Sequence, residues 1–447
     1  MEFTHKYMNA ILSNQSRRLL SLFATSALLA LASGCVRIKH TSTGSYSADD
    51  FKVETTRTVT GAFPADLKNL EIDNRSGEIR IVATETSSGQ WSWKLKTHAK
   101  TEALAIEAGN AVTCQPVREG DHVRLAVVFP DSSKYRASFE SDLEIQVPKA
   151  IALRTANRYG ATTISGIGGD VDATGQSGSM ELSNIGGKVR AQNSYASLKL
   201  HGAASATLKN QSGSIEVSDI HGPLDAETSY ATLTAQNIES SIRIRNQSGS
   251  VEVNHVKGDA DLQTSYATLS AKNIAGSLKA RDQSGSVKVH GIKGNADIKT
   301  SYAELSAQGI SGDVILANQC GRISAKDITG SVKAATTYAD LNLETASQKI
   351  NCQNQSGSIR VRATSPEIAG IEAKTSYGKM EVLLPAGLKP VIQAHTTYAE
   401  VESDYPIIPK PATTETLAEA DPAVPRINLQ NQSGAIRIVR EKATAAR

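Results

Sequence analysis

The chain has 447 residues, and its formal net charge of +3 is small for that length. Proteins that bind nucleic acids usually carry a concentrated basic patch, so this near-balance argues against a nucleic-acid partner. Apolar residues make up 39% of the chain and aromatic residues 4%. That content is thin for one large globular core, but it is sufficient for a narrow and repetitive core of small residues.

The first 35 residues have the features of an export signal. A basic start is followed by an uncharged stretch, residues 19–32, which is shorter than the ~20 apolar residues that a membrane-spanning helix needs. The small residues before Cys35 resemble the lipobox of bacterial lipoproteins. This resemblance implies that residues 1–34 are a lipoprotein signal peptide and that Cys35 is lipidated. The alternative is an ordinary secretory signal followed by a chance cysteine.

The next two segments are expected to join the lipid to the body of the protein and to cap its core. We expect residues 35–64 to be a tether and residues 65–150 to be a β-rich N-terminal cap over the open end of the core. The cap holds an early copy of the repeat at residues 74–81, and residues 102–107 could form a short helix. Strand-like runs occur at residues 91–96, 123–129 and 143–147.

Residues 151–404 are dominated by an internal repeat. Asn-Gln-Ser-Gly or a close variant recurs with its serine at positions 177, 212, 248, 284 and 356, and Cys320 takes the missing step. A second motif, Ser/Thr-Tyr-Ala, recurs with the same period of about 36 residues at Tyr195, Tyr230, Tyr266, Tyr302 and Tyr338, and less regularly at Tyr159, Tyr377 and Tyr398. Each tyrosine lies about 18 residues from the neighbouring serine. The two motifs are therefore alternating forms of one 18-residue unit.

The apolar residues of each unit predict short β-strands. They form two i, i+2 pairs and one isolated position, as in Ile242 and Ile244 followed by Val251, Val253 and Val256. The Ser-Gly or Tyr-Ala pair and a second small-residue junction supply the turns. Two short strands cannot bury their own apolar side, so we predict an all-β fold in which the units stack as coils of a β-solenoid. Residues 18 apart would then lie ~4.8 Å apart along the axis.

The outward positions of successive units carry opposite charges. Asp225 and Glu227 lie 18 residues before Arg243 and Arg245, so stacking would place each acidic residue beside a basic one. Such cross-strand pairs contribute roughly 0.2–1 kcal/mol each. We interpret these charges as structural, because a ligand-binding patch would more naturally gather one sign.

The C-terminal part departs from the regular repeat. Residues 405–425 contain five prolines and are expected to form a loop inserted in the last coils. The pattern resumes in residues 426–440 as a terminal coil, and residues 441–447 are expected to be a disordered tail.

Three stretches carry a family resemblance over about residues 65–440. Residues 145–148 (Ile-Gln-Val-Pro), residues 164–171 (Ile-Ser-Gly-Ile-Gly-Gly-Asp-Val) and the repeated Ser-Gly-Ser-Ile/Val-x-Val resemble the bacterial putative-adhesin β-solenoid family. The resemblance implies an exported β-solenoid and offers no catalytic motif to carry over. Adhesion is the function that this resemblance suggests.

The residue types that carry chemistry are dispersed, so we predict no catalytic residue, no metal site and no cofactor. His201 and His290 occupy the same position of units five apart, ~24 Å along the axis, which is too far for a shared metal ion. Cys320 and Cys352 lie two units apart, ~10 Å, beyond the reach of a disulfide. Cys352 falls on an inward strand position, and Cys114 has no evident partner.

Two interpretations of the recurring tyrosines remain open. In the first, Tyr195, Tyr230, Tyr266, Tyr302 and Tyr338 form an aromatic strip that stacks on sugar rings or another repetitive ligand. In the second, each ring packs over the Ser-Gly of the coils above and below and fills the corner at the density of a core. The strict alternation with the smallest residues favours packing.

These observations predict a non-enzymatic, lipid-anchored protein of the bacterial cell envelope, at the outer membrane or in the periplasm rather than in the cytoplasm. It would be an adhesin or surface scaffold for an envelope protein or glycan, attached to the membrane through its N-terminal lipid. End-to-end self-association through an uncovered end of the solenoid is a further possible contact. The alternative is a carbohydrate-active β-helix enzyme with its site in the cap or in the Pro-rich loop.

Overall fold

The structure is a computed structural model that describes residues 37–45, 53–131, 134–407 and 424–441, the first of these by its main chain only. The expected signal peptide, Cys35, the middle of the Pro-rich loop and residues 442–447 lie outside the described residues. All described residues belong to one structural unit, Arg37–Arg447.

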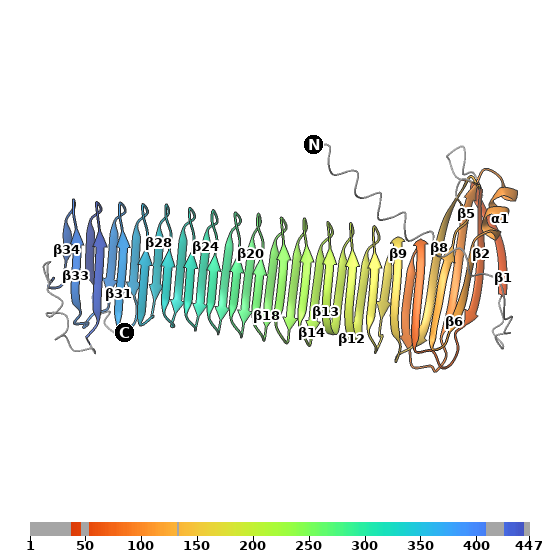
Figure 1. The fold of residues 1–447 in the computed structure, drawn as a ribbon, viewed down its shortest axis with the longest axis horizontal. Coiled ribbons are helices and arrows are strands. Elements are labelled where there is room, and N and C mark those ends of the chain that lie inside the picture. Colours follow the sequence, from red (N-terminus) through yellow and green to blue (C-terminus); the bar gives the residue numbers. More distant parts are fainter. Residues whose placement is uncertain (1–36, 46–52, 132–133, 408–423, 442–447) are drawn as a thin grey trace, which may run out of the picture. The chain divides into compact units, whose positions relative to one another are not determined.

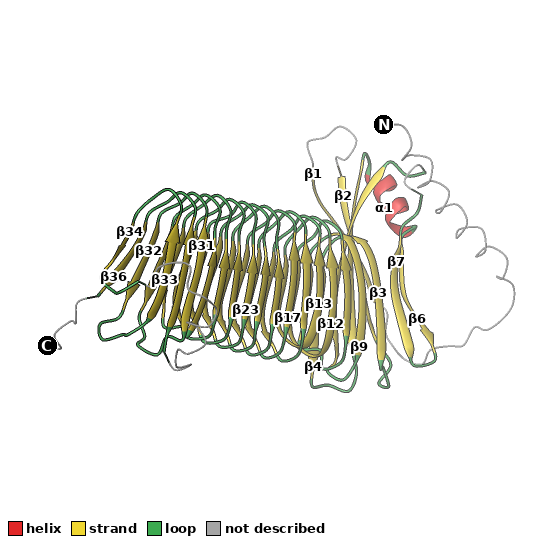
Figure 2. Ribbon diagram, turned by 60° about the vertical axis from the view of Figure 1, so that its left-hand side comes forward, coloured by secondary structure: helices red, strands yellow, loops and turns green. Residues whose placement is uncertain are grey.

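The unit is all-β, and its larger part is the stack of parallel coils that the repeat predicts (Figures 1 and 2). From β14 to β32, which cover residues 215–384, each even-numbered strand pairs with the next even-numbered strand, and each odd-numbered strand with the next odd-numbered one. These two series form the two faces of a β-solenoid, which we call the even face and the odd face. The predicted fold class is confirmed.

The even face consists of β14 (Ile215–Ile220), β16 (Leu233–Ile238), β18 (Val251–Val256), β20 (Leu269–Ile274), β22 (Val287–Ile292), β24 (Leu305–Ile310), β26 (Ile323–Ile328), β28 (Leu341–Thr345), β30 (Ile359–Ala363) and β32 (Met380–Leu384). The odd face consists of β15 (Leu224–Thr228), β17 (Ile242–Asn246), β19 (Ala260–Gln263), β21 (Leu278–Arg281), β23 (Ala296–Lys299), β25 (Val314–Ala317), β27 (Val332–Ala335), β29 (Lys349–Gln353) and β31 (Gly370–Thr375). The first coils are built from β3 (Asn69–Ser76), β4 (Ile79–Thr84), β9 (Ala152–Tyr159), β10 (Thr162–Ser165), β11 (Val171–Gly175), β12 (Met180–Asn193) and β13 (Leu198–Asn210).

The register of the strands follows the sequence alternation. Val251 and Val253 of β18 are buried, whereas Glu252 between them is exposed. Each strand aligns with the strand one coil away, so that Asp225 lies opposite Arg243 and Glu227 opposite Arg245. The predicted stacking of opposite charges is therefore confirmed for these strands. At this degree of exposure such pairs contribute at most about 1 kcal/mol each.

A left-handed residue resets the alternation near the end of the even-face strands from β14 to β26. In β16, Gln236 and Asn237 both point outward before Ile238 returns to the core, because Asn237 has a positive φ of 55°. Asparagine, aspartate and glycine tolerate this conformation better than other residues. The equivalent column of residues comprises Gly166, Asn184, Gly202, Asp219, Asn237, His255, Asn273, Gly291, Gly309 and Asp327.

At the N-terminal end, both faces continue into the predicted β-rich cap (Figure 2). The even face is extended by β8 (Ala137–Pro148), β5 (Gln90–Ala99), β2 (Val53–Ala62) and β1 (Arg37–Ser45), and the odd face by β7 (His122–Val128) and β6 (Thr113–Glu119). The predicted helix is confirmed as α1 (Glu102–Asn110), whose first turn is capped by the Thr101 hydroxyl. Trp93 is fully buried in the cap, and its indole N–H donates to Ser141 Oγ at 2.8 Å.

The expected tether needs correction. Residues 35–64 include β2 and β1, which pair with each other and, through β2, with β5. This segment is therefore part of the cap sheet over those strands. The threonine-rich sequence of β2 suits a strand, and β2 lies between β1 and β5.

The C-terminal coils are stacked in an order that differs from the sequence. The last segment forms β35 (Arg426–Asn431) and β36 (Ile436–Arg440), and the preceding coil consists of β33 (Val391–Thr396) and β34 (Val401–Ser403). β35 pairs with β31 on one side and with β33 on the other, and β36 lies in the same way between β32 and β34. The coil of residues 426–440 is therefore intercalated, and the terminal coil in space is that of residues 391–403.

Candidate functional site

The turn that leads from the odd face to the even face is fixed by a buried polar side chain. Asn246 ends β17, and its Nδ2 donates to the carbonyl oxygens of Ala231, one coil back, at 2.9 Å and of Gly249 in its own turn at 2.6 Å. Its Oδ1 accepts the N–H of Gly249 at 3.2 Å. One amide side chain thus closes the turn and joins it to the neighbouring coil.

This buried polar column was missed in the sequence analysis, although its signal is visible. Every tyrosine or serine of the repeat is preceded, two positions earlier, by asparagine, threonine or another small residue. The buried members at this corner are Asn74, Asn157, Asn193, Asn210, Thr228, Asn246, Thr264, Asp282, Thr300, Asn318, Thr336, Asn354, Thr375 and Asn431.

The glycine of the Ser-Gly turns is required by close packing between coils. A Cβ atom added to Gly249 would lie 1.8 Å from the carbonyl oxygen of Ala231, a distance that no real contact allows. The same approach occurs at Gly213 toward Ala196, at 1.9 Å. The same approach occurs in tyrosine coils that carry glycine, as at Gly160 toward Gly77, so this glycine position is tight throughout the corner.

The tyrosines project from this corner into solvent. The exposed fraction is 53–61% for Tyr159, Tyr195, Tyr230, Tyr266, Tyr302, Tyr338 and Tyr377, and 75% for Tyr398. The prediction that each ring packs into the corner at core density is therefore wrong. The turn backbone, rather than the ring, fills the space between coils.

The alternation of tyrosine and serine is a property of the stack and not of the chain order. Ser76 aligns with Tyr159 although 83 residues separate them, because the cap is inserted between their coils. At the other end, Ser433 N–H bonds to the Ser376 carbonyl and Tyr398 N–H to the Gln432 carbonyl, so Ser433 lies between Tyr377 and Tyr398. The spatial column reads Ser76, Tyr159, Ser177, Tyr195, Ser212, Tyr230, Ser248, Tyr266, Ser284, Tyr302, Cys320, Tyr338, Ser356, Tyr377, Ser433 and Tyr398.

We call this column, together with the glutamine that precedes Cys320 and each serine except Ser76, the tyrosine edge. Neighbouring rings are two coils apart, ~9.6 Å at the spacing of β-strands. Between two rings the intervening coil presents exposed Gln247 and Ser248, or their equivalents. No tyrosine hydroxyl of the edge makes a hydrogen bond with another described residue, so these hydroxyls are available to a ligand.

The middle of the tyrosine edge is electrically neutral. The exposed turn residues from Ser194 to Ser286 are serine, threonine, glutamine, tyrosine, alanine and glycine. Asp282 is the one acidic member of these turns, and it is buried. Charged turn residues begin at Glu304 and Arg322. The edge therefore offers aromatic rings, hydroxyls and amides without a dominant charge.

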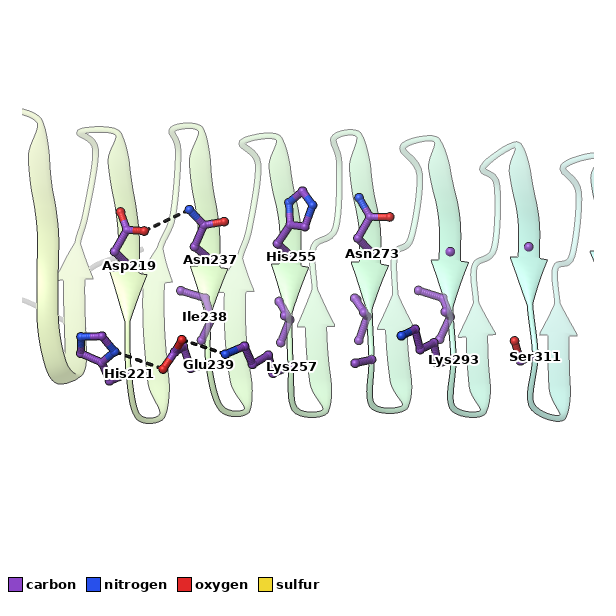
Figure 3. A pocket seen from close by; sticks show the side chains of 16 residues that line it. Asp219, His221, Asn237, Ile238, Glu239, His255, Lys257, Asn273, Lys293 and Ser311 are labelled. Atoms are coloured by element: carbon purple, nitrogen blue, oxygen red, sulfur yellow. Dashed lines mark hydrogen bonds and ion pairs between the residues drawn. The ribbon is translucent and has the colours of Figure 1, made fainter.

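The opposite corner carries a shallow groove of about 740 Å³ along the column of left-handed residues (Figure 3). Asn237 donates to Asp219 at 3.0 Å, and Glu239 bridges His221 at 3.2 Å and Lys257 at 2.8 Å. The contacts with Lys257 and His221 lower the pKa of the Glu239 carboxyl. The charges at this end of the groove thus satisfy one another.

The cysteines and histidines lie where the sequence placed them. Cys114 and Cys352 are buried, and burial raises the pKa of each thiol to about 12. Cys320 is exposed at the corner, and none of these three forms a disulfide. His201 and His290 share one column, five coils apart. Within the described ranges, no group of three or more His, Cys, Asp or Glu side chains could hold a metal ion.

None of the helices in the described part of the chain is long and apolar enough to span a membrane.

Comparison with solved structures gives two likenesses at low identity. A putative cell adhesion protein from Clostridium sporogenes is 8% identical, with a TM-score of 0.15, covering 91% of this chain and all of that one. A putative adhesin from Bacteroides fragilis is 11% identical, with a TM-score of 0.19, covering 66% of this chain and 96% of that one. No curated protein matches the chain. The model of the Toastrack DUF4097 family matches residues 67–319, more than half of the sequence, and the chain belongs to that family.

Proposed function

We propose that the protein is a non-enzymatic scaffold of the cell envelope, a lipid-anchored adhesin that holds its partner along the tyrosine edge. The observation that carries this proposal is the solvent exposure of eight aligned tyrosines. Exposed aromatic surface marks binding sites on soluble proteins, because apolar surface in contact with water is unfavourable and a partner that covers it removes this cost. The fold does not need these rings, since the corner is closed by its buried asparagines and by the close approach of its glycines.

Lipidation of Cys35 would place the membrane next to the cap. Cys35 precedes β1 by two residues, and two residues span at most ~7 Å. The stack from the coil of Ser76 to that of Tyr398 has fifteen steps, roughly 70 Å at the strand spacing. A lipid at the cap would thus leave the tyrosine edge free along the whole stack. Replacing Cys35 by serine should abolish the incorporation of labelled fatty acid, and persisting label would contradict the anchor.

Alanine substitution of three tyrosines tests the binding role. Tyr230→Ala, Tyr266→Ala and Tyr302→Ala together should reduce the adhesion of protein-coated beads to cells and envelope fractions at least tenfold. The matched control replaces three exposed side chains of the even face, Glu216→Ala, Glu252→Ala and Lys288→Ala. It should adhere like the unmodified protein.

Both triple variants should unfold within a few degrees of the unmodified protein, because all six side chains are exposed and such changes cost little. Equal adhesion of the tyrosine variant and the control would refute the proposed role of the edge. The described residues of the cap provide no observation that favours the enzymatic alternative.

A further inference from the structure

We infer that the tyrosine edge binds a linear, uncharged, β-1,4-linked polysaccharide, with one tyrosine beneath every second sugar. This inference rests on the proposed function and names the class of its ligand. It follows from the spacing, the chemistry and the neutrality of the edge.

The spacing is the first argument. All coils between Leu224 and Arg362 stack in register, so the rings recur at a constant two-coil interval of ~9.6 Å. An extended β-1,4-linked pyranose chain is a flat ribbon that repeats every two sugars over nearly the same distance. Every second sugar then presents the same face to the edge. A helical α-linked chain turns away from a straight row of rings after a few sugars.

The chemistry between the rings is the second argument. Sugar rings combine an apolar C–H face with a rim of hydroxyls, and aromatic rings with nearby hydrogen-bonding groups suit both. Between two tyrosines the edge supplies a glutamine amide and a serine hydroxyl, as at Gln247 and Ser248. These groups both donate and accept, as sugar hydroxyls require.

Neutrality is the third argument. The exposed turns from Ser194 to Ser286 carry no charge, which gives an anionic polymer no electrostatic reason to bind. The charges of the faces lie beside the edge and not on it, and some of them form exposed ion pairs, such as Lys209–Glu227 at 3.1 Å. An uncharged polymer matches this surface best.

The repetition predicts how the affinity depends on ligand length. A single exposed tyrosine binds one sugar weakly, but linked contacts along one chain add through their high effective concentration. The eight rings span seven intervals, which is room for about fourteen sugars at two per interval. The affinity should therefore rise steeply until the oligosaccharide covers several rings.

The experiment is calorimetric titration of the full chain with β-1,4-linked oligosaccharides of glucose and of N-acetylglucosamine, from two to eight sugars long. The dissociation constant of at least one series should fall more than tenfold from the dimer to the octamer. The α-1,4-linked glucose series of the same lengths should show no such fall. Tyr266→Phe should bind the octamer like the unmodified protein, whereas Tyr266→Ala with Tyr302→Ala should weaken it more than tenfold.

A spacing variant provides the sharpest control. Ser248→Tyr combined with Tyr266→Ser keeps the number of tyrosines but moves one ring by one coil, which breaks the two-coil interval. An octamer covers about four rings, and in this variant only the rings from Tyr302 to Tyr398 keep the two-coil interval over that length. The variant should therefore bind fewer octamers per chain than the unmodified protein, with Tyr266→Ser alone as the comparison. An unchanged number of bound octamers per chain would overturn the inference.

Failure of this inference is distinguishable from failure of the proposed function. If neither β-linked series shows a length-dependent affinity, the inference is wrong, whether the edge then binds a protein or a second copy of the chain. The adhesion assay with the triple tyrosine variant would still decide the role of the edge independently.

Discussion

Asp282 shows how strongly a single position of the buried corner column is constrained. It occupies the place that Asn246 has two coils earlier, and it is 6% exposed. Asn246 donates its amide hydrogens to two carbonyl oxygens, and an ionised carboxylate cannot donate to their equivalents, Ala267 and Gly285. Burial raises the pKa of the Asp282 carboxyl above its ordinary 3.8, and the N–H groups of the turn offset only part of this.

Replacing Asp282 by asparagine should stabilise the protein by about 1 kcal/mol at pH 7, since the amide restores the missing donors. A raised pKa means that the folded state binds more protons than the unfolded one. The stability of the unmodified protein therefore decreases as the pH rises from 3.8 through the folded-state pKa, and the asparagine variant lacks this decrease. The advantage of the variant should shrink as the pH falls through the same window. Urea unfolding of both proteins at neutral and acidic pH measures the difference in their free energy of unfolding. A difference that does not depend on pH would contradict the claim that the buried carboxylate of Asp282 destabilises the fold.

At the scale of residues, the sequence predicted which side chains share a column and which strand residues are buried, as for Val251 and Glu252. It could not predict the exposure of the tyrosines, because the rule that successive residues point to opposite sides holds within a strand and ends at a turn. Tyr266 lies in a turn, where its direction depends on a backbone against which Gly285 of the next coil packs.

At the scale of elements, the intercalated C-terminal coil could not be predicted from the apolar pattern. Any coil of this protein offers the same alternation to its neighbours, so residues 426–440 fit equally well after residues 370–384 or after residues 391–403. The alternation of the corner residues contains the missing information. Tyr377 and Tyr398 follow each other in sequence, and only the insertion of Ser433 between them restores the order of the stack.

Deleting residues 424–447 should release the coil of residues 391–403. β33 and β34 are paired in the structure only with β35 and β36 among the described strands outside their own coil, so the deletion removes their ladder partners. In a hydrogen-exchange experiment, the backbone amides of residues 391–403 should lose their protection and those of β15 to β31 should keep it. The reason is that coils in a solenoid stabilise mainly their neighbours. If the released coil instead pairs directly with β31 and β32, its protection will persist and the expectation is wrong.

At the scale of the whole molecule, residues 18 apart stack on each other, whereas the chemistry of the corner alternates over 36 residues. In the regular part of the stack, the glycine of a Ser-Gly coil lies against the carbonyl oxygen of the alanine one coil back, so a Ser-Gly coil fits beside a Tyr-Ala coil. Both periods are visible in the sequence, and the alternation was expected to come from the packing of the rings. The backbone approach at Gly249 gives the alternation a different cause.

Deletion of 36 residues should be tolerated better than deletion of 18. Removing residues 249–284 joins Ser248 to Gly285 and keeps the alternation, so the shortened protein should melt within a few degrees of the original. Removing residues 249–266 joins Ser248 to Ala267 and puts an alanine where Gly249 has no room for a Cβ atom. Its melting temperature should be clearly lower, and equal melting of the two deletions would show that the 18-residue coil is sufficient.

The two-coil unit also sets the steps in which this molecule can change during evolution. Unequal recombination between similar repeats would add or remove 36 residues at a time, and each event would change the edge by one whole ring and keep the order of serine and tyrosine coils at the junction. The binding surface can therefore become longer or shorter in steps of two coils while the fold stays the same. Selection for or against a gene segment that encodes two coils would then act on the number of tyrosine rings along the edge.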